Sequence, residues 1–272
     1  MAIVKRKPRN ASLRTQSFVV TPDLTKKRPE KSLTTTLNKK GGRNAYGRIT
    51  VRHRGGGNKR LYRIIDFKRV HRDIPGTVKA IEYDPNRNVD IALIYYKNGA
   101  KGYILRPDEL KVGDTVMASV NADVSVGNAL PLHSIPTGFM VHNIELQPMQ
   151  GGKIARSAGT SAQLVSKEGG KAVLKMPSRE VRTVNLNSWA TVGVLGKAEW
   201  RNQSIGKAGR TRHRGFRSSV RGMAMNPVDH PHGGGEGRSK SGSHPVSPWG
   251  VGAKGTRTRR KKNPALISRR KK

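Results

Sequence analysis

The amino-acid sequence predicts an all-β fold of two small barrels flanked by long, basic, irregular extensions. Short β-prone runs separated by turn residues fill positions 61–200, and the 272-residue chain is only 34% hydrophobic and 5% aromatic, too little for one large core. Residues 1–60 hold 17 Lys and Arg against 2 acidic residues, and residues 201–272 hold 19 against 2. Positions 61–200 hold 18 against 13, so only the middle has the charge balance of an ordinary folded domain.

The first predicted barrel covers residues 61–125. Its β-branched and aromatic runs predict strands at 61–67, 77–83, 89–96, 103–105 and 115–120. Turn residues separate these runs, most clearly at Asp84-Pro85-Asn86 and at Asn98-Gly99. About five short strands within roughly sixty residues are typical of the five-stranded Greek-key barrel of the oligonucleotide-binding type.

A second set of strands predicts another small barrel at residues 126–200. The runs lie at 140–146, 162–166, 171–175, 181–185 and 190–195. Lys167-Glu168-Gly169-Gly170 is a hairpin signal between two of them. An alternative is one continuous sandwich of about ten strands over the whole middle region, because sandwiches and barrels share this spacing.

The extensions, residues 1–60 and 201–272, are interrupted by glycine and proline throughout. Breaks such as Pro22, Pro29 and Gly55-Gly56-Gly57 leave room for no helix longer than a turn or two. The extensions also lack periodic apolar residues, and ordering a residue costs about 1–2 kcal/mol. Alone in water they are therefore predicted to be mostly disordered, and their order is expected to come from a partner.

The formal net charge of +37 predicts a polyanionic partner, and nucleic acid is the obvious one. Glycine lets the backbone approach phosphates and base edges, while Lys and Arg release condensed counterions. Three tryptophans are too few and too scattered for the stacking platform of a single-strand binder. The composition therefore favours recognition of folded RNA by its shape and backbone, with a nonspecific DNA-compacting protein as the competing interpretation.

The composition also excludes several classes of site. Cysteine is absent, which rules out disulfides, thiolate zinc sites and cysteine nucleophiles. No run approaches the ~18 apolar residues of a membrane-spanning helix, and no apolar stretch follows the basic N-terminal residues. We therefore expect no membrane partner, and a protein of the cytosol or of an organelle's interior.

A glycine turn lies among cations at residues 52–60 (RHRGGGNKR). It is superficially similar to a phosphate-cradling loop. The spacing is not that of a P-loop and no helix follows, so nucleotide hydrolysis is not expected. Contact with RNA phosphates needs no such architecture.

The densest group of chemically active side chains lies at residues 226–238, where His230 and His232 stand beside Asp229, with His244 shortly after. Two such histidines could hold a metal ion, or a carboxylate-oriented His230 could act as a general base, as in a metal-dependent hydrolase. Such sites need rigid support, whereas this segment is rich in proline and glycine. We therefore predict no enzymatic activity and no metal site, and an ordered loop that packs polar side chains against RNA.

Several motifs together resemble the large-subunit ribosomal protein two family, which has bacterial and organellar members. The matching stretches follow one another over essentially the whole chain: 62–69 (YRIIDFKR), 82–87 (EYDPNR), 141–146 (VHNIEL), 155–159 (ARSAG) and 220–235 (VRGMAMNPVDHPHGGG). Two segments depart from the family pattern. No proline follows closely after Arg217, and residues 200–203 have no counterpart that can be matched.

The resemblance implies an oligonucleotide-binding-type barrel followed by an SH3-like barrel, with both extensions buried in large-subunit rRNA. The predicted parts are residues 1–60, 61–125, 126–200 and 201–272. The resemblance further implies a primary rRNA binder, with the small subunit across the subunit interface and tRNA near the peptidyl-transferase region as additional partners.

By the same resemblance, Asp229 and His230 would lie toward the peptidyl-transferase region. We favour structural support of the RNA there over a chemical role for His230, because a lone histidine supplies little acid–base catalysis. No cofactor is expected, while magnesium ions that bridge protein and RNA are left open. The predicted rRNA-binding residues are Arg52, His53, Arg54, Lys59, Arg60, Arg63, Lys68, Arg69, Arg87, Arg156, Arg212, Arg214, Arg217, Arg221, Asn226, His230, His232, Arg238, Lys254 and Arg257.

Overall fold

The structure is a computed structural model that describes residues 2–25, 28–236, 242–256, 261 and 263–269. The described residues form two compact units. The first combines the described parts of Met1–Asn38, Lys59–Ala208 and Pro264–Lys272, and the second those of Lys39–Asn58 and Gly209–Asn263. The four-part division of the chain made from the sequence stays a prediction.

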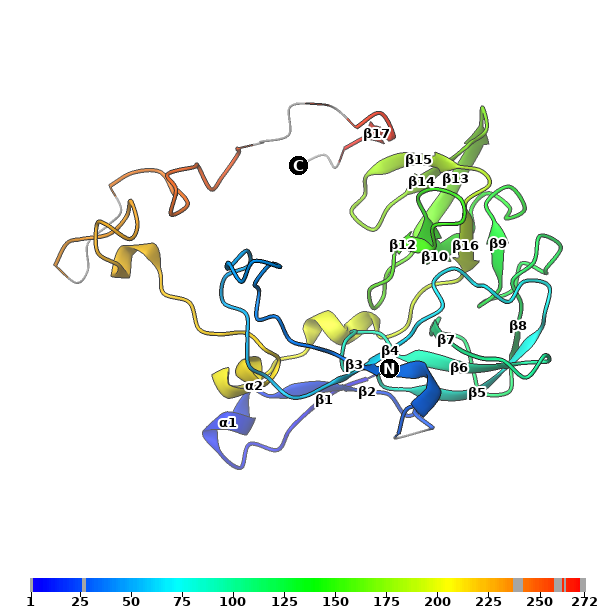
Figure 1. Cartoon of the computed structure of the whole chain (residues 1–272), viewed down its shortest axis with the longest axis horizontal. Coiled ribbons are helices and arrows are strands. Elements are labelled where there is room, and N and C mark those ends of the chain that lie inside the picture. The colour runs from blue at the N-terminus through cyan, green and yellow to red at the C-terminus, as the bar shows by residue number, and fades with distance from the viewer. Residues whose placement is uncertain (1, 26–27, 237–241, 257–260, 262, 270–272) are drawn as a thin grey trace. The chain divides into compact units, whose positions relative to one another are not determined.

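Strands dominate the first unit (Figure 1). A four-stranded antiparallel sheet has the order β7–β6–β5–β8. Its members are β5 (Gly76–Glu82), β6 (Ile91–Tyr96), β7 (Lys101–Leu105) and β8 (Thr115–Val116). They match four of the five strands predicted for the first barrel.

The first predicted strand, residues 61–67, is shorter than expected. Only β4 (Leu61–Arg63) is regular, and it pairs with β3 (Thr34–Thr36), which follows the 3-10 helix η1 (Lys31–Leu33). Ile65 then makes a single parallel bridge to Tyr103 of β7. The extension before the barrel therefore contributes a strand to it.

Strand β6 is central and is buried on both faces, which explains its nearly continuous apolar sequence. Ile91 and Leu93 pack with Tyr103 in one hydrophobic cluster, whereas Ala92 and Ile94 belong to another. Because alternate residues of a strand face opposite sides, one strand supplies both clusters.

The second barrel contains a seven-stranded antiparallel sheet with the order β17–β15–β14–β13–β10–β16–β9. The strands are β9 (Ala129–Pro131), β10 (Met140–His142), β13 (Ala162–Glu168), β14 (Lys171–Lys175), β15 (Val181–Asn185), β16 (Trp189–Val192) and β17 (Leu266–Ser268). The predicted hairpin is confirmed, because β13 and β14 pair across Gly169 and Gly170. Both glycines have positive φ angles, 53° and 73°, which glycine adopts without strain.

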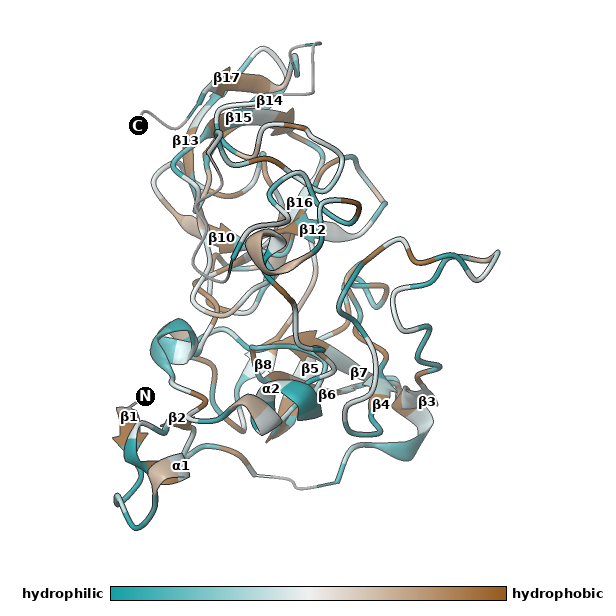
Figure 2. Cartoon of the chain, turned by 90° about the vertical axis from the view of Figure 1, so that its left-hand side faces the viewer, coloured by the Kyte–Doolittle hydropathy of each residue, from teal (hydrophilic) through white to brown (hydrophobic). Residues whose placement is uncertain are grey.

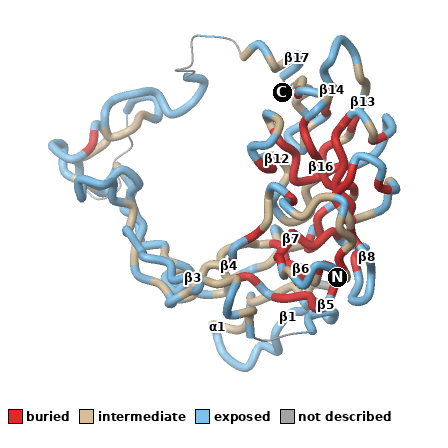
Figure 3. Tube along the Cα trace, turned by 45° about the vertical axis from the view of Figure 1, so that its right-hand side comes forward, coloured by how far each residue is buried: buried red, intermediate tan, exposed pale blue. Residues whose placement is uncertain are grey.

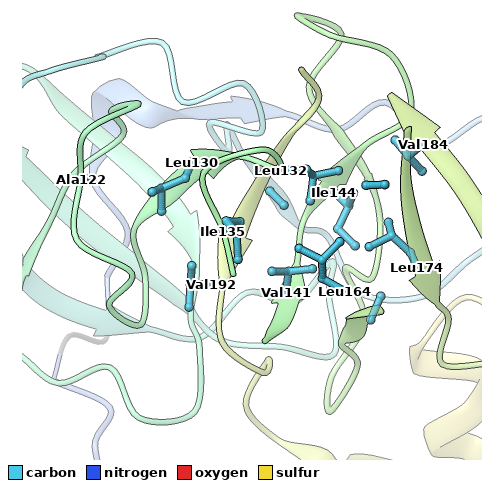
Figure 4. Close-up of a cluster of buried hydrophobic side chains, with 13 residues drawn as sticks. Ala122, Leu130, Leu132, Ile135, Val141, Ile144, Leu164, Leu174, Val184 and Val192 are labelled. Carbon is cyan, nitrogen blue, oxygen red and sulfur yellow. The ribbon is translucent and has the colours of Figure 1, made fainter. Parts of the chain in front are cut away.

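One hydrophobic cluster fills this barrel (Figure 4). Val141, Leu164 and Leu174 are fully buried in it and come from three neighbouring strands. On β14 the buried positions alternate with exposed Lys171 and Lys175, as in a strand that covers a core on one face. The sequence pattern that predicted these strands therefore also identifies the side that faces inward.

The predicted strand at residues 140–146 is two strands in the structure. Asn143 has a φ of 49°, in the left-handed region, and separates β10 from β11 (Ile144–Glu145). Strand β11 leaves the large sheet and pairs with β12 (Gly152–Ile154). A run of β-prone residues cannot reveal such a break, because it depends on a single backbone conformation.

The two barrels have separate cores, so the alternative of one continuous sandwich is wrong and the all-β fold of two small barrels is confirmed. Polar groups join the barrels. Buried Arg69 donates to the carbonyl of Gly127 at 2.6 Å, and Gly152 N donates to Phe67 O at 2.9 Å.

Besides η1 and β3, two further stretches of the predicted extensions contribute strands to the first unit. Strands β1 (Ala2–Lys5) and β2 (Ser17–Val20) form a hairpin around α1 (Ala11–Arg14), and Ser17 N donates to Ser204 O just after η2 (Ala198–Asn202). Near the other end of the chain, β17 pairs with β15. The expectation that the extensions are irregular and without an apolar pattern is therefore wrong for these stretches.

The described part of the second unit has little regular structure beyond α2 (Ala208–His213), which begins at its edge, and η3 (Gly222–Ala224). Most of it is exposed (pale blue in Figure 3), and α2 is hydrophilic (teal in Figure 2). His230 is the one buried residue among those described in this unit. None of the helices in the described ranges is long and apolar enough to cross a membrane.

Candidate nucleic-acid interface

The structure brings segments of the two predicted extensions together in the second unit. Residues 53–58 run antiparallel to residues 213–217, with a bridge between Arg54 and Phe216. The backbone hydrogen bonds, each 3.0 Å long, run from Gly55 N to Gly215 O, from Asn58 N to His213 O and from Arg217 N to His53 O. This arm pairing places predicted RNA-binding residues from both extensions side by side.

Two arginines of the second unit stack on aromatic rings. The guanidinium carbon of Arg54 lies 4.1 Å from the ring centroid of Phe216, and that of Arg52 lies 5.0 Å from Trp249. Stacking uses the face of the guanidinium group and leaves its N–H edge for a phosphate or a base. The rings thus orient two of the predicted RNA-binding arginines.

A hollow of about 370 Å³, the arginine hollow, lies against the arm pairing. Arg43, Arg52, Arg54 and Arg217 line it, and no carboxylate of the described residues does. Guanidinium groups bind phosphate oxygens in bidentate, charge-assisted hydrogen bonds. The hollow therefore has the charge of a site for nucleic-acid backbone.

The histidine loop, residues 225–234, folds around the carbonyl of Asn226. That oxygen accepts hydrogen bonds from Asp229 N at 3.0 Å and from His230 N at 3.3 Å. The His230 ring packs so closely on Gly222 that a Cβ there would lie 2.5 Å from it. Glycine at position 233 allows this loop to close on itself, because a Cβ there would lie 2.2 Å from the Asn226 oxygen.

Both histidine rings of the loop accept a backbone hydrogen bond, which assigns their tautomers. His232 N donates to His230 Nδ1, and Val246 N donates to His232 Nε2, both at 3.0 Å. The Asp229 side chain is exposed and makes no hydrogen bond to either ring within the described residues. Among all the residues that the structure describes, no group of three His, Asp or Glu side chains lies so that it could hold a metal ion.

A second basic surface lies on the first unit, where two hollows of about 560 and 710 Å³ share Phe67, Lys153 and Arg156. The guanidinium carbon of Arg156 lies 4.2 Å from the Phe67 ring centroid. Arg87 lines the larger hollow and is oriented by an ion pair with Asp84. The predicted residues Arg87 and Arg156 therefore lie at one surface, although they are 69 positions apart in the sequence.

One buried carboxylate fixes the loop that leads to Lys153. Glu145 accepts hydrogen bonds from Met149 N at 3.1 Å, from Gly151 N at 2.7 Å and from Trp189 N at 3.1 Å. Hydrogen bonds to a charged acceptor are among the stronger ones. Glu145 thereby positions one wall of the basic surface.

The remaining predicted RNA-binding residues differ in exposure. Arg63 and Arg69 are buried, at 7% and 4% exposed, and donate to the carbonyls of Leu61 and Gly127. Arg60 is half-buried. The exposed residues are Lys59, Lys68, Arg212, Arg214, Arg221, Asn226 and Lys254. Arg238 and Arg257 lie outside the described residues.

Sequence reasoning missed Arg43 and the aromatic partners Phe216 and Trp249. Arg43 lies in the same glycine-rich basic stretch as Arg52, and its place beside Gly41-Gly42 is the signal that could have identified it. The rings offered no comparable signal. Phe216 and Trp249 belong to the C-terminal extension, whereas the arginines that stack on them, Arg54 and Arg52, belong to the N-terminal extension.

Two small β barrels combined with exposed arginines that aromatic rings orient define a nucleic-acid-binding protein. Residues 30–118 match the family model "Ribosomal Proteins L2, RNA binding N-terminal domain", and residues 125–250 match "Ribosomal Proteins L2, C-terminal domain". The chain is also 54% identical over 263 residues to the large ribosomal subunit protein uL2 of Paracoccus denitrificans (strain Pd 1222), covering 97% of this chain and 94% of that protein. The chain therefore belongs to the ribosomal protein L2 family, as the sequence motifs predicted.

Proposed function

We propose that this chain is a structural constituent of the large ribosomal subunit that binds large-subunit rRNA and has no enzymatic activity of its own. In this proposal it supports subunit association, tRNA binding and the peptidyl-transferase region. Membership of the L2 family and the match to an RNA-binding domain support the first part. The finer roles rest on the family resemblance of the histidine loop and the extensions.

The arm pairing is the observation on which the RNA-binding proposal depends. It gathers arginines from both extensions around the arginine hollow, and the lining residues that the structure describes include no acidic one. The described part of this unit buries only His230, so no hydrophobic core offsets the repulsion between the cations. A bound polyanion neutralises these cations and thereby stabilises the folded form of this unit.

The salt dependence of binding tests the proposal. The full chain should bind a transcript of its own large-subunit rRNA with log K falling steeply against log salt, by about 0.7–0.9 for each phosphate neutralised. Arg52→Gln and Arg54→Gln should each reduce the magnitude of that slope by about 0.7–0.9, the contribution of one phosphate contact. The exposed Lys111, in the turn before β8, provides the control variant Lys111→Gln, which should leave the slope unchanged.

Two outcomes would contradict the proposal. A nearly flat salt response would exclude backbone contacts by the extensions. Equal affinity for the rRNA transcript and for duplex DNA of the same length would instead favour the DNA-compacting alternative. Hydrolysis of RNA that stops when a chelator is added would favour the metal-dependent hydrolase.

The finer roles require assembled particles. Large subunits reconstituted without this chain should join small subunits poorly and bind tRNA weakly, and adding the full chain should restore both. Normal joining and tRNA binding by complete particles that lack only this chain would remove these roles and leave rRNA binding intact.

A further inference from the structure

Tyr46 is the most exposed aromatic side chain among the described residues, at 89%. It lies at the tip of a tight loop in the second unit, the Tyr46 loop, residues 43–49. An antiparallel bridge between Arg43 and Ile49 closes this loop. The base of the loop is part of the arginine hollow, because both bridge residues line it.

Backbone groups and the Asn44 side chain hold the tip in shape. Asn44 Oδ1 accepts hydrogen bonds from Tyr46 N at 3.0 Å and from Arg48 N at 3.1 Å. Asn44 N donates to Arg48 O at 3.0 Å, and Gly47 N donates to Asn44 O at 3.2 Å. None of these contacts uses the Tyr46 side chain, so the loop presents the ring without depending on it.

The ring itself has no protein partner within the described residues: no ring contact, cation contact or side-chain hydrogen bond involves it. A single exposed apolar side chain is common on protein surfaces and by itself indicates nothing. Tyr46 differs in being carried outward on a preformed loop next to a cationic hollow. Preformed loops bind with a smaller loss of conformational entropy than flexible ones.

The charge around the loop identifies the class of partner. Arg43 and Arg48 flank the tip, and residues 31–65 contain no Asp or Glu. Aromatic side chains beside cations suit a nucleobase that is attached to a phosphate backbone, since the ring stacks on the base while the cations hold the phosphates. Unpaired bases of folded RNA offer both groups at once.

We infer that Tyr46 is a stacking platform for one unpaired base of the large-subunit rRNA, with the neighbouring backbone held in the arginine hollow. The inference rests on the proposed function, namely that this chain binds that RNA. It adds a contact to the base, which the arginine hollow alone does not supply. Stacking tolerates any base, so this contact selects an unpaired nucleotide by its position in the RNA fold.

The test compares the affinities of full-length variants for the rRNA transcript at one fixed salt concentration. Removal of a base–aromatic stack, Tyr46→Ala, should weaken binding by about 5- to 150-fold. Tyr46→Leu, which keeps apolar bulk without an aromatic face, should weaken it similarly, whereas Tyr46→Phe should bind like the wild type. The slope of log K against log salt should be unchanged in all three, because no cation is removed.

Two controls accompany these variants. Val112→Ala alters an exposed apolar residue at another turn and should not affect affinity. Ultraviolet cross-linking of the wild-type complex should attach a nucleotide to the peptide that contains Tyr46, and Tyr46→Leu should lose that adduct. Thermal melting should show that all variants fold.

The outcomes separate this inference from the proposed function. A wild-type chain that does not bind the transcript would defeat both. Wild-type binding with an unaffected Tyr46→Ala variant would overturn the stacking role alone. Tyr46→Leu binding as tightly as wild type would show a merely apolar contact, and weak binding by Tyr46→Phe would show that the hydroxyl group is the contact; either result overturns stacking.

Discussion

The backbones of Gly57 and Gly215 approach so closely that a Cβ on Gly57 would lie 2.7 Å from Gly215 N. Gly57 also has a φ of +79°, which other residues rarely adopt. The two extensions therefore meet at a point where only glycine is accommodated. A substitution at Gly57 therefore tests the arm pairing directly.

Gly57→Ala should separate the paired segments. In hydrogen exchange, the amides of Gly55, Asn58 and Arg217 should lose protection, and the affinity for rRNA should fall with them. The melting of the barrels should stay unchanged, because this contact lies in the second unit.

Gly56→Ala is the matched control for the arm pairing. Gly56 has a φ of +65°, but no described atom would lie within 4 Å of a Cβ added to it. Gly56→Ala should therefore introduce backbone strain of about 1–2 kcal/mol, without the steric clash expected for Gly57→Ala. Equal loss of amide protection in both variants would show that strain, and not the close approach of the two backbones, explains the effect.

His142 is expected to make the first unit sensitive to acid. Burial lowers the pKa of His142 to about 4, although its Nδ1 donates a hydrogen bond to Gly193 O at 2.9 Å. The unfolded chain has an ordinary histidine pKa of about 6.5, so between these values the unfolded state binds the extra proton. The free energy of unfolding should therefore fall by about 3 kcal/mol on this account as the pH falls from about 7 to 4.

Urea denaturation at a series of pH values measures this effect. His142→Gln can still donate to Gly193 but does not titrate, so its stability should fall less than that of the wild type over this range. His133→Gln, at an exposed position, should follow the wild-type profile. Parallel profiles for all three proteins would show that His142 is not the titrating group.

Glu145 should be a major determinant of stability. Glu145→Ala leaves the buried N–H groups of Gly151 and Trp189 and the partly buried N–H group of Met149 without their acceptor. Because each buried unsatisfied group costs about 1–3 kcal/mol, the free energy of unfolding should fall by at least about 2 kcal/mol. Glu145→Gln retains one acceptor oxygen and should lose less.

Chemical denaturation of the purified chain checks the Glu145 prediction. Glu168→Ala, at an exposed position at the end of β13, should change stability by no more than about 0.5 kcal/mol. A loss for Glu145→Ala no larger than that of Glu168→Ala would mean that water replaces the carboxylate without cost.

His230 should act through the histidine loop and not through proton transfer. The Oε1 atom of Gln can replace Nδ1 as the acceptor for His232 N, whereas Leu cannot. Reconstituted particles with His230→Gln should form peptide bonds at the wild-type rate, and those with His230→Leu should be impaired. A large rate loss in correctly assembled His230→Gln particles would establish a chemical role.

The strands of the two barrels were largely predictable because their signals are local. The hairpin at Gly169-Gly170 and the alternation on β14 depend on neighbouring residues only. The break at Asn143 was not predictable, since it depends on one residue in the left-handed conformation, after which β11 pairs with β12 and not with the large sheet. The hairpin β1–β2 was missed because its strands lie in the stretch that charge and proline and glycine content marked as an irregular extension.

The candidate interface was predicted as a set of residues but not as an arrangement. The cations of the glycine turn and of residues 212–217 stand out by composition, whereas their pairing requires two segments about 155 positions apart to meet. Composition also cannot distinguish exposed from buried cations. It grouped Arg63 and Arg69 with the exposed arginines, although both are buried and donate to protein carbonyls.

The all-β class, the two barrels, the polyanionic partner and the family follow from the sequence alone, because each of these depends on local pattern, on total charge or on ordered motifs. Which arginines share a hollow and which aromatic rings orient them became clear from the tertiary structure alone. Those relationships are contacts between distant segments, and they depend on how closely two backbones approach, which no local pattern encodes.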